Sequence, residues 1–181
     1  MKIREVSGLK LTRVHIIGNP ASGKSYLAKI LSKKLHARHY DLDDITFKRK
    51  YDLKRSKEDC TRILKKICMR KRWITEGVYW KWISEALTKS DVIIWLDFPL
   101  TLTTFRIIRR HLARKLADKI DCKDDLLNLL KYSFRYKFGK KAAYPNFKNT
   151  LKPYKKKVII IRNSKEFENL IHAVSKSQPA F

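Results

Sequence analysis

Residues 13–31 read RVHIIGNPASGKSYLAKIL, and this stretch decides the fold. Residues 13–17 are rich in β-branched side chains, which predicts a short strand that ends at Gly18. A turn of small and polar residues follows, and the next residues place Leu27 and Leu31 at the spacing of one helix face. The predicted order is therefore strand, glycine-containing turn and helix.

The turn, Gly18 to Ser25, matches the pattern G-x-x-x-x-G-K-[ST] without a gap, in the strand-to-helix context that the pattern requires. Its two glycines permit backbone conformations in which successive N–H groups point at phosphate oxygens. Lys24 is placed to reach the β- and γ-phosphates of a nucleotide, and the Ser25 hydroxyl is placed to bind Mg²⁺. The predicted nucleotide-binding residues are Gly18, Asn19, Pro20, Ala21, Ser22, Gly23, Lys24, Ser25 and Tyr26.

Further along the chain, strands alternate with helices. The predicted strands cover residues 13–17, 38–42, 72–75, 92–97 and 158–161. The predicted helices follow the phosphate loop and then cover about 57–71, 80–88, 99–116 and 123–138, with a last helix capped by Asn163 or Ser164. The helix at 99–116 has an apolar row predicted to face inward: Leu102, Phe105, Ile108 and Leu112. This alternation predicts an α/β fold in three layers, with one parallel sheet covered by helices on both faces.

Composition limits the class of protein. The chain has 181 residues, which suits a single domain spanning 1–181, and 44% hydrophobic residues, which argues against wholesale disorder. No apolar run is long enough for a membrane span. The net charge of +26 has two interpretations: it serves to attract polyanions, or it reflects a lysine-rich proteome. Cys60 and Cys68 stand at helical spacing among apolar residues, which predicts that their thiols are buried. The number of cysteines is odd, which argues against a set of disulfides and predicts a reducing, cytoplasmic location.

Five segments together carry a resemblance to a known family: the phosphate loop, HYDLDDI, WITEGVYW, VIIWLDFP and FRIIRRHL. From Arg13 to Val174 the chain resembles the nucleoside monophosphate kinase-like branch of P-loop proteins, which includes adenylate, shikimate and gluconate kinases. It is most similar to the adenylate kinase-related group called DNA topology modulation proteins. The resemblance implies a P-loop NTPase fold with the sheet order 2-3-1-4-5, and ATP with Mg²⁺ as the cofactor.

The resemblance also implies roles for acidic residues at two strand ends. The second strand ends in three acids, Asp41, Asp43 and Asp44. In the shikimate- and gluconate-kinase-like members of the family, acids at this strand end face the acceptor substrate and the metal. Alternatively, one of the three caps the following segment. Glu76 ends the third strand, where the family has an acid that orients metal-bound water. Trp80 stands where the family has a phosphate-binding arginine, which puts a nucleoside monophosphate acceptor in doubt. The predicted acceptor-binding residues are Asp43, Asp44, Glu76 and Trp80, and the predicted metal-binding residues are Ser25 and Glu76.

Arginines follow the fourth strand. Arg106, Arg110 and Arg114 recur every four residues and so share one helix face, which indicates either a solvated basic face or donors for transferring phosphates. The resemblance implies that Arg106 and Arg110 contact the nucleotide, with Arg109 as a substitute. Asp97 is predicted to cap this helix rather than to bind metal.

A basic, aromatic stretch follows. Residues 126–165 contain twelve Lys or Arg, seven Tyr or Phe and no acid, which is typical of single-stranded nucleic-acid binding and also of a lid over a phosphorylated ligand. The helical spacing of Leu126, Leu130, Phe134 and Phe138 indicates that several of these residues belong to the core. A lid-like region is therefore predicted at about 106–150.

The function predicted first is transfer of the γ-phosphoryl group of ATP to an unidentified small-molecule acceptor. The predicted catalytic residues are Lys24, Arg106, Arg110 and Asp43. The alternative is a nucleotide-regulated nucleic-acid-binding protein with weak ATPase activity. No membrane partner is predicted.

Overall fold

A single five-stranded sheet organises the chain in a computed structural model, which describes residues 11–48, 53–117, 126–139 and 142–176. The strands are β1 (Arg13–Gly18), β2 (Arg38–Asp41), β3 (Trp73–Gly77), β4 (Val92–Leu96) and β5 (Val158–Ile161). All four pairings are parallel and the order is β2-β3-β1-β4-β5, which confirms the predicted fold and topology. The register pairs Gly18 with Leu96 and Ile17 with Gly77, so the ends of the three central strands meet at one edge.

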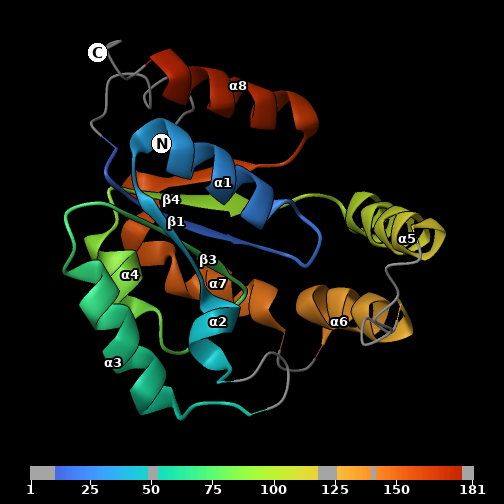
Figure 1. The fold of residues 1–181 in the computed structure, drawn as a ribbon, viewed down its shortest axis with the longest axis horizontal. Helices are drawn as coiled ribbons and strands as arrows, with labels where there is room; N and C mark the ends of the chain where they lie inside the picture. The colour runs from blue at the N-terminus through green and yellow to red at the C-terminus, as the bar shows by residue number, and fades with distance from the viewer. Residues whose placement is uncertain (1–10, 49–52, 118–125, 140–141, 177–181) are drawn as a thin grey trace.

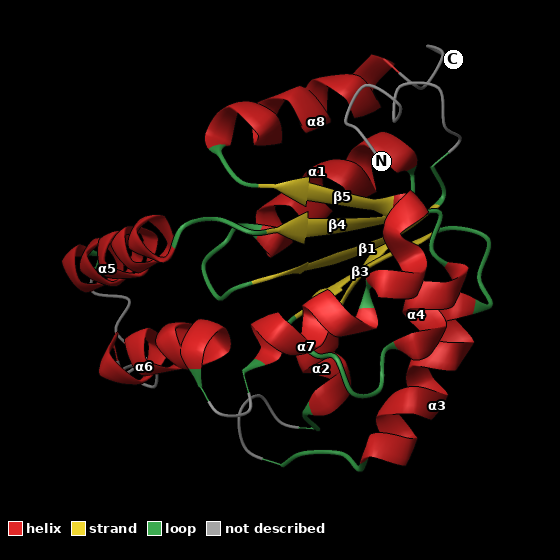
Figure 2. Cartoon of the chain, turned by 180° about the vertical axis from the view of Figure 1, so that it is seen from behind, coloured by secondary structure: helices red, strands yellow, loops and turns green. Residues whose placement is uncertain are grey.

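Helices cover both faces of the sheet (Figure 1). They are α1 (Lys24–Leu35), α2 (Leu42–Thr46), α3 (Lys57–Cys68), α4 (Ser84–Lys89), α5 (Leu100–Leu116), α6 (Leu126–Phe138), α7 (Ala143–Thr150) and α8 (Ser164–Lys176), with a 3-10 helix η2 (Lys152–Lys157) before β5. One face carries α1 and α8, and the other carries α3, α4 and α7. In Figure 2 the strand arrows point toward the side on which α5 and α6 lie. These two helices therefore stand at the carboxyl end of the sheet, where ligands bind in open α/β folds.

Two apolar clusters fill the space on either side of the sheet. Val14 and Ile16 of β1 belong to the cluster beneath α1 and α8, whereas Ile17 belongs to the opposite cluster, as strand alternation requires. His15 is fully buried, and its Nδ1 lies 2.8 Å from the Thr75 Oγ1. Burial lowers the pKa of His15 to about 4, so the imidazole is neutral at pH 7.

Both described thiols are buried, as predicted. Cys60 is 2% exposed and Cys68 is 2% exposed, and burial raises the pKa of each. Cys122 lies outside the described residues. At the last helix, the Asn163 Oδ1 accepts a hydrogen bond from the Glu166 N–H at 2.9 Å, so Asn163 is the capping residue.

The chain between α6 and β5 contains helices for which no bounds were predicted. Residues 143–150 form α7, and the 3-10 helix η2 follows. Phe147 of α7 is fully buried against Trp95 and Tyr136, with ring centroids 6.5 and 6.3 Å apart. The short helix carries Pro145 and two asparagines, whose low helix propensity hid it from sequence inspection; tertiary packing of Phe147 stabilises it. A smaller difference is that α4 begins at Ser84, not at about residue 80.

The predicted inner face of α5 is wrong for three of its four residues, and only Leu102 packs against the core. Phe105, Ile108 and Leu112 are exposed by 60%, 38% and 53%, whereas Thr103 and Ile107 are buried. A helix that lies flat on a sheet would bury such a row. Instead α5 projects beyond the strand ends and packs against α6 (Figure 1), so a narrower stripe of the helix is covered.

The row predicted for α6 is exposed only in its second half: Leu126 and Leu130 are half-buried, whereas Phe134 and Phe138 are 56% and 61% exposed and contact each other, with ring centroids 5.0 Å apart. The buried positions of α6 are Ser133 and Tyr136. Within the described ranges, no helix is long and apolar enough to cross a bilayer.

Candidate functional site

The phosphate loop lies between β1 and α1 at the carboxyl edge of the sheet. A Cβ on Gly18 would stand 2.7 Å from the Leu96 carbonyl oxygen and 2.8 Å from the Ser22 Oγ, so only glycine fits where the loop leaves β1. Gly23 has φ 94° in the left-handed region and forms the N-cap of α1. This conformation favours glycine and turns the first N–H groups of α1 toward the loop. The local geometry is therefore that of an anion-binding helix N-terminus.

Other residues of the loop differ in exposure. Pro20 and Ala21 are half-buried, and Ala21 has a positive φ of 57°. Ser22 is fully buried. Tyr26 is 63% exposed and stacks on Phe167 of α8, with ring centroids 6.2 Å apart. Tyr26 thus lies on the α8 side of the loop.

Lys24 is held beside the loop rather than extended into solvent. It is 9% exposed, and its Nζ donates to the Asn19 carbonyl oxygen at 3.0 Å. Burial lowers the pKa of Lys24, whereas the negative charges of Glu76 and Asp43 oppose that shift. A cation with only one described hydrogen-bond partner can turn toward phosphate oxygens at small cost.

Ser25 and Glu76 form a direct pair. The Ser25 Oγ donates to the Glu76 Oε1 at 2.6 Å, and Glu76 is 2% exposed at the end of β3. Burial alone would raise the pKa of Glu76, but nearby His39 and Lys24 hold it below its usual value, so the carboxylate is ionised. The His39 Nε2 is 3.6 Å from the same Glu76 oxygen, which is an electrostatic contact rather than a hydrogen bond.

The three acids at the end of β2 take different positions. Asp41 caps α2, because its Oδ1 accepts from the Asp43 N–H at 2.8 Å, and burial followed by the charge of Glu76 raises the pKa of Asp41 to about 6. Asp43 accepts a hydrogen bond from the Tyr79 hydroxyl at 2.7 Å. Asp44 is exposed. The structure therefore brings Asp43 toward Lys24 and Glu76, and assigns the capping role to Asp41.

Of the predicted arginines, Arg106 contacts the phosphate loop directly. Its NH1 donates to the Ser22 carbonyl oxygen at 3.2 Å, and its guanidinium lies 4.6 Å from the centre of the Phe98 ring. Arg110 is exposed one turn further along α5, and its charge lowers the pKa of Lys24. Arg109 is exposed. Arg106 thus contacts the loop, and Arg110 affects it only through its charge.

Asp97 does not cap α5, contrary to the prediction. It lies before Pro99, which is the N-cap residue and makes no side-chain capping bond. The Tyr144 hydroxyl of α7 instead donates to the Asp97 Oδ2 at 3.1 Å. Its role is still structural, but it ties α7 to the end of β4.

Sequence inspection missed a polar contact between the loop and both helices at the carboxyl edge. The Asn19 Nδ2 donates to the Ser133 Oγ of α6 at 2.9 Å and lies 3.4 Å from the Thr103 Oγ1 of α5. Ser133 and Thr103 are fully buried. Their only signal in the sequence is a small polar residue on a helix face that is otherwise apolar or basic.

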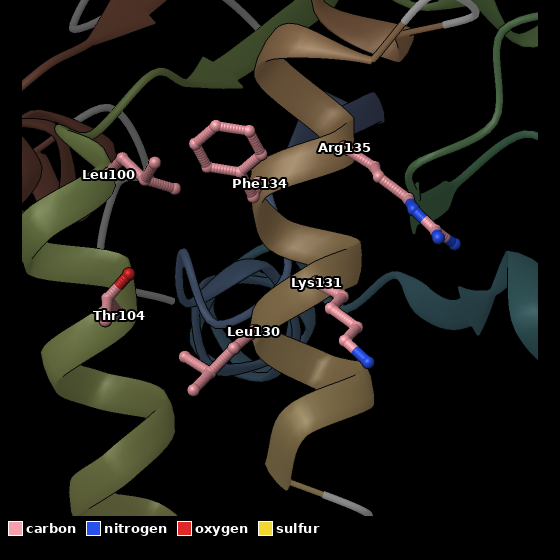
Figure 3. A pocket seen from close by; sticks show the side chains of 6 residues that line it. All are labelled: Leu100, Thr104, Leu130, Lys131, Phe134 and Arg135. Atoms are coloured by element: carbon pink, nitrogen blue, oxygen red, sulfur yellow. The ribbon is translucent and has the colours of Figure 1, made fainter.

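Two cavities of about 410 Å³ each adjoin these helices. The first lies between α5 and α6, where Figure 3 shows Leu100, Thr104, Leu130 and Phe134 directed into the gap. The second lies between the segment after β3 and the helices α6 and α7, and its wall includes Trp80, whose acceptor-binding role stays a prediction. Tyr79, Tyr132 and Arg135 also line this second cavity and were not predicted. The signal for Tyr79 was its place between Glu76 and Trp80.

Comparison with known sequences gives one partial match. No protein-family model matches the chain. A stretch of 102 residues is 28% identical to the uncharacterized protein YqaC of Bacillus subtilis (strain 168). This stretch covers 56% of this chain and 57% of the relative, so the match spans little more than half of the relative's length.

Solved structures are similar over most of the chain. A shikimate kinase from Acinetobacter baumannii matches with a TM-score of 0.55 and 16% identity, covering 88% of this chain and 89% of its own. A gluconokinase from Sinorhizobium meliloti 1021 matches with a TM-score of 0.55 and 7% identity, covering 91% and 92%. An uncharacterized protein from Eubacterium ventriosum matches with a TM-score of 0.55 and 14% identity, covering 92% and 98%. The chain therefore has the fold of P-loop kinases.

Proposed function

We propose that the protein transfers the γ-phosphoryl group of ATP to a hydroxyl group of a small acceptor. The observation that carries this proposal is the arrangement at the carboxyl edge of the sheet, where a complete phosphate loop with buried Lys24 adjoins the pair Ser25–Glu76 and the carboxylate of Asp43. Two structural neighbours are named shikimate kinase and gluconokinase, which supports a kinase-like activity.

The residues present fit a magnesium ion. Ser25 supplies a hydroxyl and Glu76 an ionised carboxylate, and hard oxygen ligands of this kind suit Mg²⁺. In the described part of the chain no cluster of three or more His, Cys, Asp or Glu could hold a metal alone. When bound, Mg²⁺ would neutralise charge on the β- and γ-phosphates.

The side chains around the loop have complementary tasks in this proposal. Lys24 binds the transferring phosphoryl group, and Arg106 and Arg110 stabilise the charge that develops on its oxygens. Asp43 orients the acceptor hydroxyl and takes its proton. In support of this role, Asp43 already accepts a hydrogen bond from one hydroxyl group, that of Tyr79, at 2.7 Å.

In the same proposal, the region 106–150 acts as a lid. Its helices α5 and α6 pack against each other and reach the loop through Arg106 and Ser133. Closure of these helices over the phosphates would exclude water from the transfer step. The lid would thereby favour transfer to the acceptor over hydrolysis.

The nucleic-acid alternative gains no specific support. Of the aromatic residues on which it rested, Tyr136 and Phe147 are buried in the core and Tyr144 is bonded to Asp97. Buried rings cannot stack on bases. The exposed rings Phe134 and Phe138 contact each other.

An acceptor screen tests the proposed function. Nucleosides, nucleoside monophosphates, hydroxy acids and sugar-like alcohols are incubated with ATP and Mg²⁺, and ADP and the phosphorylated product are measured by mass spectrometry. With the acceptor identified, Asp43→Asn should lower kcat by at least about 100-fold and leave ATP affinity unchanged, because proton transfer typically contributes that much. Asp59→Asn on the surface of α3 is the matched control and should keep full activity. Failure to bind ATP, or an unimpaired Asp43→Asn variant, would refute the proposal.

A further inference from the structure

The second cavity, between the segment after β3 and the helices α6 and α7, has an aromatic wall. It has a volume of about 410 Å³, which is within the range of small-molecule sites. Its wall contains five aromatic side chains, from the segment after β3 and from α6: Tyr79, Trp80, Trp82, Tyr132 and Tyr136. Trp82 and Tyr136 are more than 90% buried, whereas Tyr79 and Trp80 are only half-buried and Tyr132 is exposed. The buried rings form a fixed base, and the more exposed ones offer faces to a ligand.

Two cations stand at this wall. The Lys81 Nζ lies 5.2 Å from the centre of the Trp80 ring, so a positive charge and a flat surface are held side by side. Arg135 of α6 also lines the cavity, and Figure 3 shows its side chain leaving α6 on the side turned away from Leu100 and Thr104 of α5. The described residues that line the cavity include no Asp, Glu, Asn or Gln. The wall therefore attracts anions and offers little of the carboxylate and amide hydrogen bonding that a saturated polyol needs.

The cavity is connected to the transfer site through Tyr79. Its hydroxyl donates to the Asp43 Oδ1 at 2.7 Å, and its ring contacts Trp82 with centroids 5.2 Å apart. Tyr79 also lies three residues after Glu76. One side chain, Tyr79, thus separates the aromatic wall from the carboxylate that would receive the acceptor proton.

We propose that the acceptor is a flat, π-bonded ring that carries an anionic group, with the ring stacked on the wall around Trp80 and the anion paired with Arg135 and Lys81. This assignment rests on the proposed function, because it takes the cavity to be the acceptor side of a kinase site. A flat ring gains from stacking on aromatic faces beyond the area that it buries, and the anion gains from two cations at a partly desolvated surface. A saturated ring of the same size forfeits the first gain, and a neutral flat ring forfeits the second.

Three probes separate these two contributions: benzoate, which is flat and anionic; cyclohexanecarboxylate, which is saturated and anionic; and benzamide, which is flat and neutral. Their affinities are measured by NMR titration of the full chain without nucleotide. Benzoate should bind roughly three- to tenfold more tightly than cyclohexanecarboxylate, and about fivefold more tightly than benzamide. Equal affinities for all three probes would overturn the proposal. No binding of benzoate up to about 10 mM would also overturn it, because a ligand of this size is expected to have a dissociation constant of about 1 mM.

Variants assign each contribution to a residue. Trp80→Leu should abolish the preference for benzoate over cyclohexanecarboxylate, with Phe138→Leu, an exposed ring on α6 that is not among the residues lining the cavity, as the matched control. Arg135→Gln should abolish the preference for benzoate over benzamide. Lys131→Gln is its control, because Lys131 lies one turn earlier on α6 and lines only the first cavity. A variant that leaves its preference intact while the protein remains folded by circular dichroism contradicts the assignment of that residue.

The same measurements distinguish this proposal from the proposed function. If ATP binds and the acceptor found in the screen is neutral or saturated, the kinase activity stands and the cavity assignment falls. If benzoate binds with the expected preferences while ATP does not bind, the cavity is a binding site and the kinase activity falls. The second result does not depend on turnover, because both affinities are measured by binding alone.

Discussion

Replacement of Lys24 by alanine removes the cation that the structure holds at the phosphate loop. The Lys24 Nζ donates to the Asn19 carbonyl oxygen at 3.0 Å and is 9% exposed, so its hydrogen bond to a phosphate would form in a site largely closed to water. A hydrogen bond to a charged group contributes about 1.5–3 kcal/mol. Since about 1.4 kcal/mol corresponds to a factor of ten, ATP affinity should fall roughly 10- to 150-fold.

Isothermal titration calorimetry of ATP with Mg²⁺ measures this loss. Lys29→Ala is the matched control, because Lys29 is exposed on the same helix and its removal changes the net charge equally. We expect Lys29→Ala to bind ATP with wild-type affinity, and both variants to keep the wild-type circular dichroism spectrum. Equal ATP affinity of Lys24→Ala and wild type would show that residues 18–25 do not hold the nucleotide phosphates. An equal loss in both variants would show that long-range charge, rather than the contact at the loop, governs binding.

Three further predictions concern stability and charge. Burial alone would raise the pKa of Asp91, but hydrogen bonds from Thr12 and Arg13 hold this pKa below its usual value. The ionised Asp91 therefore stabilises the fold fully above about pH 4, and this stabilisation is lost as the pH falls through the folded-state pKa. Asp91→Asn should therefore be less stable than wild type by about 1–3 kcal/mol in urea unfolding at pH 7, with a difference that narrows below pH 4; a constant difference would contradict this. Phe147→Ala should lower the free energy of unfolding by about 3–5 kcal/mol, because the ring is fully buried, and a loss under about 1 kcal/mol would mean that α7 is not part of the core. Single-stranded DNA should bind only weakly at about 150 mM salt in fluorescence anisotropy, with a steep salt dependence, whereas nanomolar affinity at that salt would favour the nucleic-acid alternative.

The candidate site was predictable where a local pattern carries its own chemistry. The phosphate loop needs only a strand, two glycines, a lysine and a hydroxyl in fixed order, so its position at the start of α1 followed from residues 18–25 alone. The end of β2 was less certain, because three acids stood together and spacing could not decide between capping and catalysis. The structure separates them: Asp41 caps α2, while Asp43 is turned toward Tyr79.

The strand alternation and the phosphate loop determined the parallel sheet and one edge of the site, because both depend on residues near one another in the chain. Only the tertiary structure decided how α5, α6 and α7 lie. An apolar row on a helix indicates that one side of the helix is covered, but it does not identify the element that covers it. In α5, Phe105 of the predicted row is exposed. The contact of Asn19 with Ser133 spans 114 residues, and the aromatic cavity joins Trp80 to Arg135. Such contacts depend on how helices pack at the end of the sheet, and packing is a property of shape in three dimensions rather than of local sequence.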